Sequence, residues 1–319
     1  MHEAAAKSRS GRNSDFGLRA QRYRRAMELF PNARRAELTL PLAVLESSPQ
    51  RGGLCADLMG GTGFLGGAVA HLFDRVVVVD ESFDLLDAAR ARGLSVRPAD
   101  LHRAAPLWGQ EAPRAVVCMA ALHHVVRRDA QGVSARASHA HQRRLLQRLY
   151  RALPVGGILI IGDVGASGAG RSITNGDGQP SRPAPWARPL LRVVGRRGVG
   201  GLSLQRRTAF FRALTHRSST GHEAAYPRFG ALANCFGPSA DVGVVASLNT
   251  PWSFSSWADA GFFIHELFGM GKRAFQTPSS MRREDLDEPL RILREDLGAT
   301  DPSHVPWTLD FLVAVKGRA

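Results

Sequence analysis

The chain has 319 residues, of which 44% are hydrophobic and 22% are charged, and its formal net charge is +14. A chain of this length can bury a sizeable core, and it fits one large α/β domain or a core with a lid. No apolar run approaches the roughly 20 residues that a bilayer-spanning helix needs, so we expect no membrane segment.

The positive net charge suggests nucleic acid as a candidate partner. Only three of the basic residues are lysines (Lys7, Lys272 and Lys316), and the chain is rich in Ala and Gly, a composition typical of GC-rich coding. The arginines are spread along the chain, and no aromatic-plus-basic motif of RNA-binding sheets occurs. We therefore expect no nucleic-acid partner, and binding through the arginine-rich Arg182–Arg207 stretch stays an alternative.

The three cysteines, Cys55, Cys118 and Cys235, stand far apart. Cys55 and Cys118 lie in apolar, strand-like runs and are predicted to be buried thiols. Neither a disulfide framework nor metal-ligand spacing is present, so we expect no metal and a reducing, cytoplasmic location. The sequence does not indicate an oligomeric state.

Helix and strand patterns alternate along much of the chain. The predicted helices, in order, are Arg19–Phe30, Ala33–Leu45, Phe64–Phe73, Ser82–Arg92, Ala137–Leu153, Gln205–Thr215, Ser256–Phe268 and Arg283–Leu297. The predicted strands are Leu54–Met59, Arg75–Asp80, Ser95–Pro98, Arg114–Met119, Gly157–Asp163, Val242–Leu248 and Trp307–Val315. Such alternation predicts a doubly wound, mostly parallel sheet with helices on both faces.

Residues 165–206 differ from the rest, being rich in Gly, Ser, Pro and Arg with little periodicity. Loops of this length are usually lids or flexible segments. We predict four parts: a tail and helical cap (1–46), a cofactor-binding core (47–164), a basic flexible loop (165–206), and lid helices with the strands that complete the sheet (207–319).

A glycine-rich turn follows the first predicted strand. Gly61-x-Gly63-x-x-Gly66 satisfies the dinucleotide fingerprint, and Asp80 closes the next strand, where it would accept hydrogen bonds from ribose hydroxyls. Taken alone, this layout fits NAD and S-adenosylmethionine equally.

The acidic residues around the turn separate the two cofactors. Asp57 lies just before the glycines, where a carboxylate is unhelpful beside an anionic pyrophosphate but useful beside an ammonium group. Asp100 follows the third strand, where it could accept a hydrogen bond from an adenine amino group. These positions favour S-adenosylmethionine.

Five stretches in this order have counterparts in one family. They are Asp57-Leu58-Met59-Gly60-Gly61-Thr62-Gly63, Asp80-Glu81, Asp100-Leu101, Ala120-Ala121-Leu122-His123-His124-Val125, and Leu149-Tyr150-Arg151-Ala152-Leu153-Pro154-Val155-Gly156-Gly157. The sequence thus resembles the class I S-adenosylmethionine-dependent methyltransferases over about Asp15 to Asp163, and loosely over Trp307–Lys316. Met59 departs from the pattern, because the family usually has glycine there.

The resemblance implies a Rossmann-like fold and roles for individual residues. The implied cofactor-binding residues are Asp57, Gly60, Gly61 and Gly63 for the methionine part, Asp80 with Glu81 for the ribose, Asp100 and Leu101 for the adenine, and Ala120 beneath the cofactor. Tyr23, on the first helix, is similar to a tyrosine that closes over the cofactor in many relatives.

Polar residues near the strand ends are the candidates for chemistry. We predict His124, Asp163 and His222 as catalytic, with His124 favoured over His123 because neighbouring residues face differently. Tyr23, His123 and Trp252 are predicted to contact the substrate. Core packing is the alternative for Trp252, and a structural role is the alternative for the histidine pair. For Asp163 the alternative is capping of the following turn, and for Tyr23 it is an apolar stripe with Phe16, Met27 and Phe30 on the helix.

The sequence therefore predicts a methyltransferase that moves a methyl group from S-adenosylmethionine to an O, N or C atom of a small molecule. Three alternatives stay open: an S-adenosylmethionine-binding protein that catalyses a cyclisation or elimination, an RNA-binding methyltransferase, and a nicotinamide-dependent oxidoreductase. The identity of the acceptor is not predicted.

Overall fold

The computed structural model describes residues 18–49, 51–100, 108, 110–165, 203–217, 224–236 and 240–317. In this part of the chain, one sheet has the strand order β3-β2-β1-β4-β7-β9-β8. The chain winds outward from β1 to β3 and then returns to β4 beside β1. The pairs from β3 to β7 are parallel, and β9 runs antiparallel to both of its neighbours. This order confirms the predicted doubly wound, mostly parallel sheet.

The strands agree closely with the predicted ones. They are β1 (Leu54–Leu58), β2 (Arg75–Asp80), β3 (Ser95–Pro98), β4 (Ala115–Met119), β7 (Ile158–Asp163), β8 (Ala240–Asn249) and β9 (Thr308–Lys316). The longer helices are α2 (Thr39–Ser47), α3 (Phe64–Val69), α4 (Phe83–Ala91), α5 (Ala135–Ala152), α7 (Leu204–Arg217), α9 (Trp257–Leu267) and α10 (Arg283–Arg291). Residues 18–29 are also helical.

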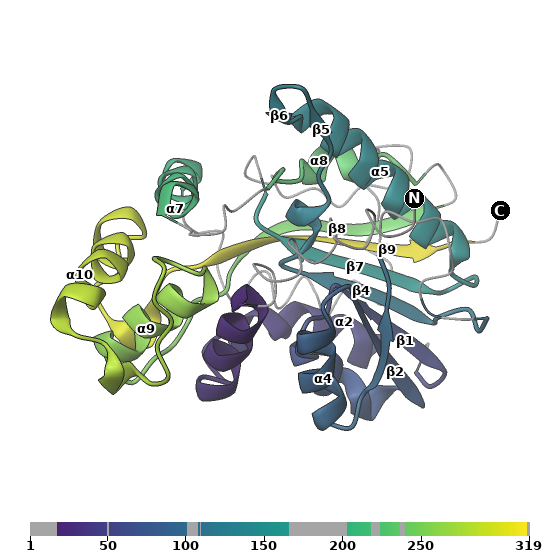
Figure 1. Ribbon diagram of the computed structural model, residues 1–319. Coiled ribbons are helices and arrows are strands. Elements are labelled where there is room, and N and C mark those ends of the chain that lie inside the picture. Colours follow the sequence, from purple (N-terminus) through teal and green to yellow (C-terminus); the bar gives the residue numbers. More distant parts are fainter. Residues whose placement is uncertain are drawn as a thin grey trace, which may run out of the picture.

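Alternate residues of each central strand face opposite sides of the sheet, and both sides are apolar. In β2, Val76 and Val78 join one buried cluster, while Val77 and Val79 join the other. Figure 1 shows α5 and α8 (Phe229–Ala233) over one face and α2 and α4 over the other. Burial on both faces explains why these strands read as continuous valine and isoleucine runs.

A buried ion-pair cluster attaches the first helix to α9. Arg22, 1% exposed, lies 3.3 Å from a Glu266 carboxylate oxygen and donates to the backbone oxygens of His265, Met270 and Gly271. Glu266 is fully buried and also pairs with Arg25 at 3.3 Å. The cluster joins residues more than 240 positions apart, so it ties the N-terminal cap to the C-terminal half of the chain.

Four local features differ from the sequence prediction. The hairpin of β5 (Arg128–Asp129) and β6 (Gly132–Val133), and the short helix α8, were not predicted. The predicted helix Ala33–Leu45 begins instead as a turn and a 3₁₀ segment, Arg35–Leu38, before α2. The predicted helix Arg283–Leu297 changes after α10 into a π-helical turn, Ile292–Asp296, just beyond Pro289, whose ring nitrogen cannot donate a helical hydrogen bond.

None of the described helices is both long and apolar enough to cross a membrane. The division into four parts remains a prediction, and most of the basic segment 165–206 lies outside the described residues.

Candidate functional site

The turn after β1 has the geometry that the glycine pattern predicts. Met59, Gly61 and Gly63 have φ of 51°, 53° and 72°, a left-handed conformation that glycine adopts freely. Gly63 begins α3, and a Cβ there would lie 2.5 Å from a Leu94 methyl carbon. The positive φ of Met59 gives the physical reason why glycine is usual at its position.

Asp57 lies beneath this turn and is 1% exposed. Its Oδ2 accepts a hydrogen bond from the Gly66 N–H at 2.9 Å, and a Cβ on Gly60 would lie 2.5 Å from its carboxyl carbon. The pKa of Asp57 is raised to about 7, chiefly by burial; the hydrogen bond from Gly66 opposes the shift, and the charge of Asp80 adds to it. The Gly66 N–H, in the first turn of α3, is therefore already bonded to a buried carboxylate. In phosphate-binding sites, N–H groups at this position of a helix bind the anionic phosphate instead.

Asp80, at the end of β2, joins the two neighbouring strand ends. Its carboxylate accepts from the Gly61 N–H at 3.0 Å and from the Ser82 N–H at 2.9 Å. Burial raises its pKa, and the backbone hydrogen bonds oppose that shift. Burial, followed by the charges of Asp80 and Asp100, raises the pKa of Glu81. Asp57, Asp80 and the glycines, predicted to share a site, are thus brought together.

The other two predicted adenine-binding residues are only partly described. Asp100 is half-buried and follows β3, which ends beside Asp80 in the register of the sheet. Leu101 lies outside the described residues.

Tyr23, predicted to close over the cofactor, lies against the glycine turn. A Cβ on Gly61 would be 3.7 Å from Tyr23 Cε1. The Tyr23 hydroxyl accepts a hydrogen bond from Arg34 Nη1 at 3.0 Å, and Arg34 forms a bidentate ion pair with Glu37 at 3.0 and 2.7 Å. Arg34 and Glu37, which the sequence prediction did not include, therefore hold Tyr23 in place.

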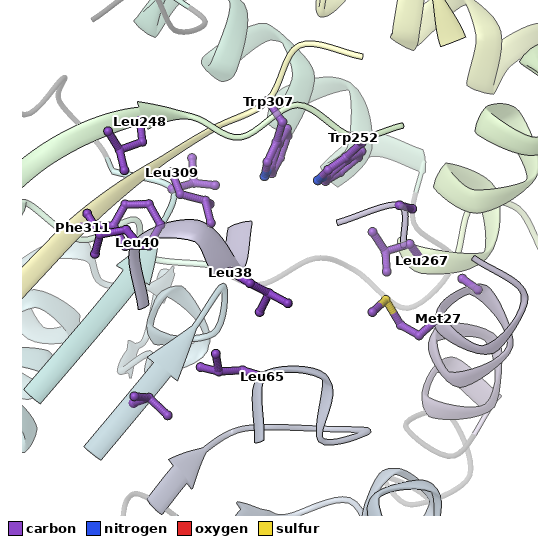
Figure 2. Close-up of a cluster of buried hydrophobic side chains, with 14 of the residues drawn as sticks. Met27, Leu38, Leu40, Leu65, Leu248, Trp252, Leu267, Trp307, Leu309 and Phe311 are labelled. Carbon is purple, nitrogen blue, oxygen red and sulfur yellow. The ribbon is translucent and has the colours of Figure 1, made fainter. Parts of the chain in front are cut away.

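Trp252 completes this network from the other half of the chain. Its side chain is 1% exposed, and its indole lies 4.3 Å from that of Trp307 (Figure 2). Its Nε1–H donates to Glu37 Oε1 at 2.8 Å. Because its ring and its one polar atom contact the protein's own side chains, the core-packing alternative describes the position of Trp252 better than direct substrate contact.

A second group gathers at the ends of β4 and β7. Ala120 has φ of 52°, and its N–H donates to the Gly162 carbonyl at 2.6 Å. His123 Nδ1 lies 2.7 Å from Asp163 Oδ1, and the His123 backbone N–H donates to Oδ2 at 2.8 Å. Asp163 is fully buried. Its two carboxylate oxygens contact both the backbone and the ring of His123 and so fix the orientation of that side chain.

The structure distinguishes the two neighbouring histidines. His123 is 6% exposed and bound to Asp163, whereas His124 is exposed, with its ring 4.0 Å from that of His123. The carboxylate thus orients His123 and not His124, which the sequence favoured. The third catalytic candidate, His222, lies outside the described residues.

Two features beside this group were not predicted from sequence. Tyr226 stacks on His123 with ring centroids 5.8 Å apart, and its hydroxyl is buried with no hydrogen-bond partner among the described residues. Asp310 faces Asp163 across the β7–β9 pair and accepts from Arg207 at 3.3 Å. No local motif marks these residues, since they meet only through the sheet and long connections.

Among the described residues, no group of three or more histidine, cysteine or acidic side chains could hold a metal ion. The site is thus made of a glycine turn with two buried carboxylates, and of a pair formed by His123 after β4, the neighbour of β1, and Asp163 at the end of β7, the next strand along.

No protein-family model matches this sequence, and a search of curated proteins finds no match. Several solved structures are similar to it. The YcgJ protein of Bacillus subtilis is 11% identical, with 88% of this chain and 98% of that chain covered at a TM-score of 0.49. NodS, an N-methyltransferase of Bradyrhizobium japonicum WM9, is 16% identical, with coverage of 43% and 70% at a TM-score of 0.34.

CalS10, an amino pentose methyltransferase of Micromonospora echinaspora seen with S-adenosylmethionine bound, is 21% identical at a TM-score of 0.31. The match covers 38% of this chain and 47% of CalS10, less than half of that protein. The fold of the present chain is established by its own strand order.

Proposed function

We propose that the chain is an S-adenosylmethionine-dependent methyltransferase that acts on a small molecule. The observation that carries the proposal is the buried Asp57 carboxylate beneath the glycine turn, bonded to the Gly66 N–H. A pyrophosphate at that turn would place two anions together in a buried site, which costs free energy. A cationic amino-acid group there would instead be attracted to Asp57.

The residues present fit such a cofactor. Asp57 would hold the ammonium group, and the Gly60–Gly63 turn would approach the methionine chain closely because its glycines carry no Cβ. Asp80 has two carboxylate oxygens at the strand end for ribose hydroxyls, with Glu81 beside it. Asp100 and Leu101 would flank the adenine, Ala120 would lie beneath the cofactor, and Tyr23 would cover the turn.

When bound, the cofactor supplies an electrophilic methyl group on a sulfonium. The protein then has to align the nucleophile of the acceptor with that methyl group and exclude water. The buried strand ends of β4 and β7 offer the groups for this. Asp163 fixes the ring of His123, and Tyr226 presents a hydroxyl beside it. We assign these three residues to the acceptor side of the site.

The proton that the acceptor loses has several candidate recipients. His123 is one candidate, because Asp163 accepts from both its backbone and its ring and so fixes its orientation. His124 and His222, predicted from sequence, remain candidates. The atom that is methylated, O, N or C, and a role in secondary metabolism remain predictions.

The cofactor is tested by binding measurements that need no acceptor. We expect S-adenosylhomocysteine, and not NAD, to raise the melting temperature and to bind in calorimetry. Stabilisation by NAD alone would overturn the proposal in favour of an oxidoreductase.

Asp80→Asn should weaken S-adenosylhomocysteine binding by about tenfold or more, since it removes a charge-assisted hydrogen bond. Asp74→Asn is the matched control: Asp74 also accepts a backbone N–H, that of Gly53 at 2.6 Å, but at the opposite end of β1. Equal effects of the two substitutions would remove Asp80 from the cofactor site.

A cyclisation or elimination enzyme would bind the same cofactor. It is separated from a methyltransferase by mass spectrometry of products from cofactor whose methyl group carries deuterium. A methyltransferase moves all three deuterium atoms to the acceptor, whereas the other enzymes do not.

A further inference from the structure

Helix α5 carries an unusual set of charges. It contains five arginines and no acidic residue, and no Asp or Glu occurs between Asp129 and Asp163. Arg144 and Arg148 are spaced i, i+4, and Arg148 and Arg151 are spaced i, i+3, so like charges are neighbours on the helix surface. Such spacing destabilises an isolated helix, and it therefore needs a reason.

The exposed arginines share one face of α5. At about 100° per residue, four of them fall within an arc of about 100° and along about 22 Å of helix. These exposed residues are Arg136, Arg143, Arg144 and Arg151. The opposite side packs on the sheet through Leu145, Leu146 and Leu149. In Figure 1, α5 lies on one side of the sheet, next to α8.

Three other helices of the same chain place an acidic residue beside an arginine. Arg24 pairs with Glu28, Arg90 with Asp87, and Arg291 with Glu288, each three or four residues away. Within the described part of the chain, no ion pair involves any of the four residues of the arginine face. Coding bias explains arginine in place of lysine, but it does not explain the lack of acidic partners on α5. Helix α7 also lacks acidic residues, but its Arg206 donates to the Leu297 carbonyl and its Arg207 pairs with Asp310.

The chemistry of the arginine face suits phosphate. Guanidinium groups bind phosphate oxygens in a bidentate manner, and a row of them matches a regularly charged backbone. Between the arginines lie Ala140 and the half-buried Gln147, whose amide donates to the Cys235 carbonyl at 2.8 Å. Neither is a large apolar anchor of the kind found in protein–protein interfaces or inserted into membranes. The face also lacks aromatic rings on which single-stranded bases could stack.

We infer that the arginine face of α5 binds the phosphate backbone of a nucleic-acid duplex without reading its sequence. This goes beyond the proposed methyl transfer and does not depend on it. It also differs from the expectation that the protein has no nucleic-acid partner. That expectation rested on arginines spread along the sequence, whereas four of them share one face of a folded helix.

The test compares two variants with the same change of net charge. In the first, Arg136, Arg143, Arg144 and Arg151 are all changed to Gln. In the control, four arginines outside α5 are changed to Gln: the exposed Arg90 and Arg282 and the half-buried Arg24 and Arg291. Binding to a fluorescein-labelled DNA duplex of about 20 base pairs, and to single-stranded RNA of the same length, is followed by anisotropy from about 50 to 300 mM salt.

We expect the wild-type protein to bind the duplex with an affinity that falls steeply with salt. The face variant should lose about 100-fold in affinity at low salt, and its salt slope should fall by about 3 to 4, whereas the control variant should change little. Both variants should melt near the wild-type temperature, which shows that they are folded.

Three outcomes would overturn the inference: no binding of the duplex by wild type, equal losses in the two variants, or binding only to vesicles of phosphatidylserine and phosphatidylcholine. Tighter binding of RNA than of the duplex would also contradict it. None of these outcomes bears on cofactor binding, which is measured separately.

Discussion

The indole Nε1–H of Trp252 donates a hydrogen bond of 2.8 Å to Oε1 of Glu37, which lies 215 residues earlier in the chain. Glu37 forms an ion pair with Arg34, and Arg34 donates a hydrogen bond to the hydroxyl of Tyr23, which packs against the glycine turn. A residue of the C-terminal half is therefore connected, through buried polar contacts, to the wall of the proposed cofactor site.

Trp252→Phe should lower the free energy of unfolding by about 1–2 kcal/mol more than Trp307→Phe. Both indoles are buried and packed on each other, but the Trp307 Nε1–H has no hydrogen-bond partner among the described residues. Both variants lose the same ring volume, so the difference between their unfolding free energies measures the contribution of the Trp252–Glu37 hydrogen bond. Urea unfolding measures both losses, and equal losses would show that the Glu37 contact contributes nothing.

Asp57→Asn should stabilise the cofactor-free protein at pH 8. The folded pKa of about 7 lies above the ordinary value of 3.8, so the native state keeps a proton that the unfolded chain releases. The free energy of unfolding is therefore highest below about pH 4, decreases as pH rises from about 4 to about 7, and does not change further above pH 7 on account of this group. The variant should exceed wild type by on the order of 2–4 kcal/mol at pH 8 and by little at pH 4.5. Parallel pH profiles in denaturant unfolding would contradict the buried, titrating carboxyl.

Binding of S-adenosylhomocysteine should weaken as pH falls below about 7, by up to about tenfold per pH unit. The ammonium group of the ligand favours the ionised form of Asp57, so binding releases a proton wherever that residue is protonated in the free protein. Calorimetry in buffers of different ionisation enthalpy measures the release directly. Asp57→Asn should bind more weakly and without this pH dependence; an unchanged pH dependence would assign the titration to another group.

Glu266→Ala should cost about 3–5 kcal/mol of stability, because Arg22 would be left as a buried charge without its carboxylate. Glu28→Ala removes an exposed partner of Arg24 on the same helix and should cost less than about 1 kcal/mol. Thermal and urea unfolding compare the two. Similar small losses would mean that the cap is held by packing alone.

Tyr226→Phe should leave stability unchanged or raise it slightly, since the buried hydroxyl has no partner among the described residues. Burial and the charge of Asp163 raise the pKa of Tyr226, so the group stays a neutral phenol at ordinary pH. Tyr150→Phe is the control, because the Tyr150 hydroxyl donates to the Val315 carbonyl at 3.4 Å. Once an acceptor is identified, a loss of turnover in Tyr226→Phe without a loss of stability would support its place on the acceptor side.

Much of the sheet could be predicted because its strands are buried on both faces and read as apolar runs between turns. The boundaries of β2 and β3 agree with the predicted ones to the residue. The β5–β6 hairpin could not be predicted, since Arg128–Asp129 and Gly132–Val133 are too short and too polar to show a strand period.

The residues of the candidate site also fall into a group that could be predicted from sequence and a group that could not. The glycines and Asp57 and Asp80 are local in sequence, and the structure brings them together. The choice between His123 and His124 depends on a carboxylate 40 residues away, and the Trp252–Glu37 contact depends on the packing of both ends of the chain. Neither leaves a local pattern.

The left-handed backbone at Met59 and Ala120 has a consequence for how the site comes into being. Neither residue favours that conformation, and each is held by a hydrogen bond to a neighbouring strand, from Met59 to Val79 at 2.7 Å and from Ala120 to Gly162 at 2.6 Å. The bends are thus imposed by the assembled sheet and not by local preference. A peptide spanning residues 52–66 would not keep the turn, and the binding surface exists only where four strands have already met.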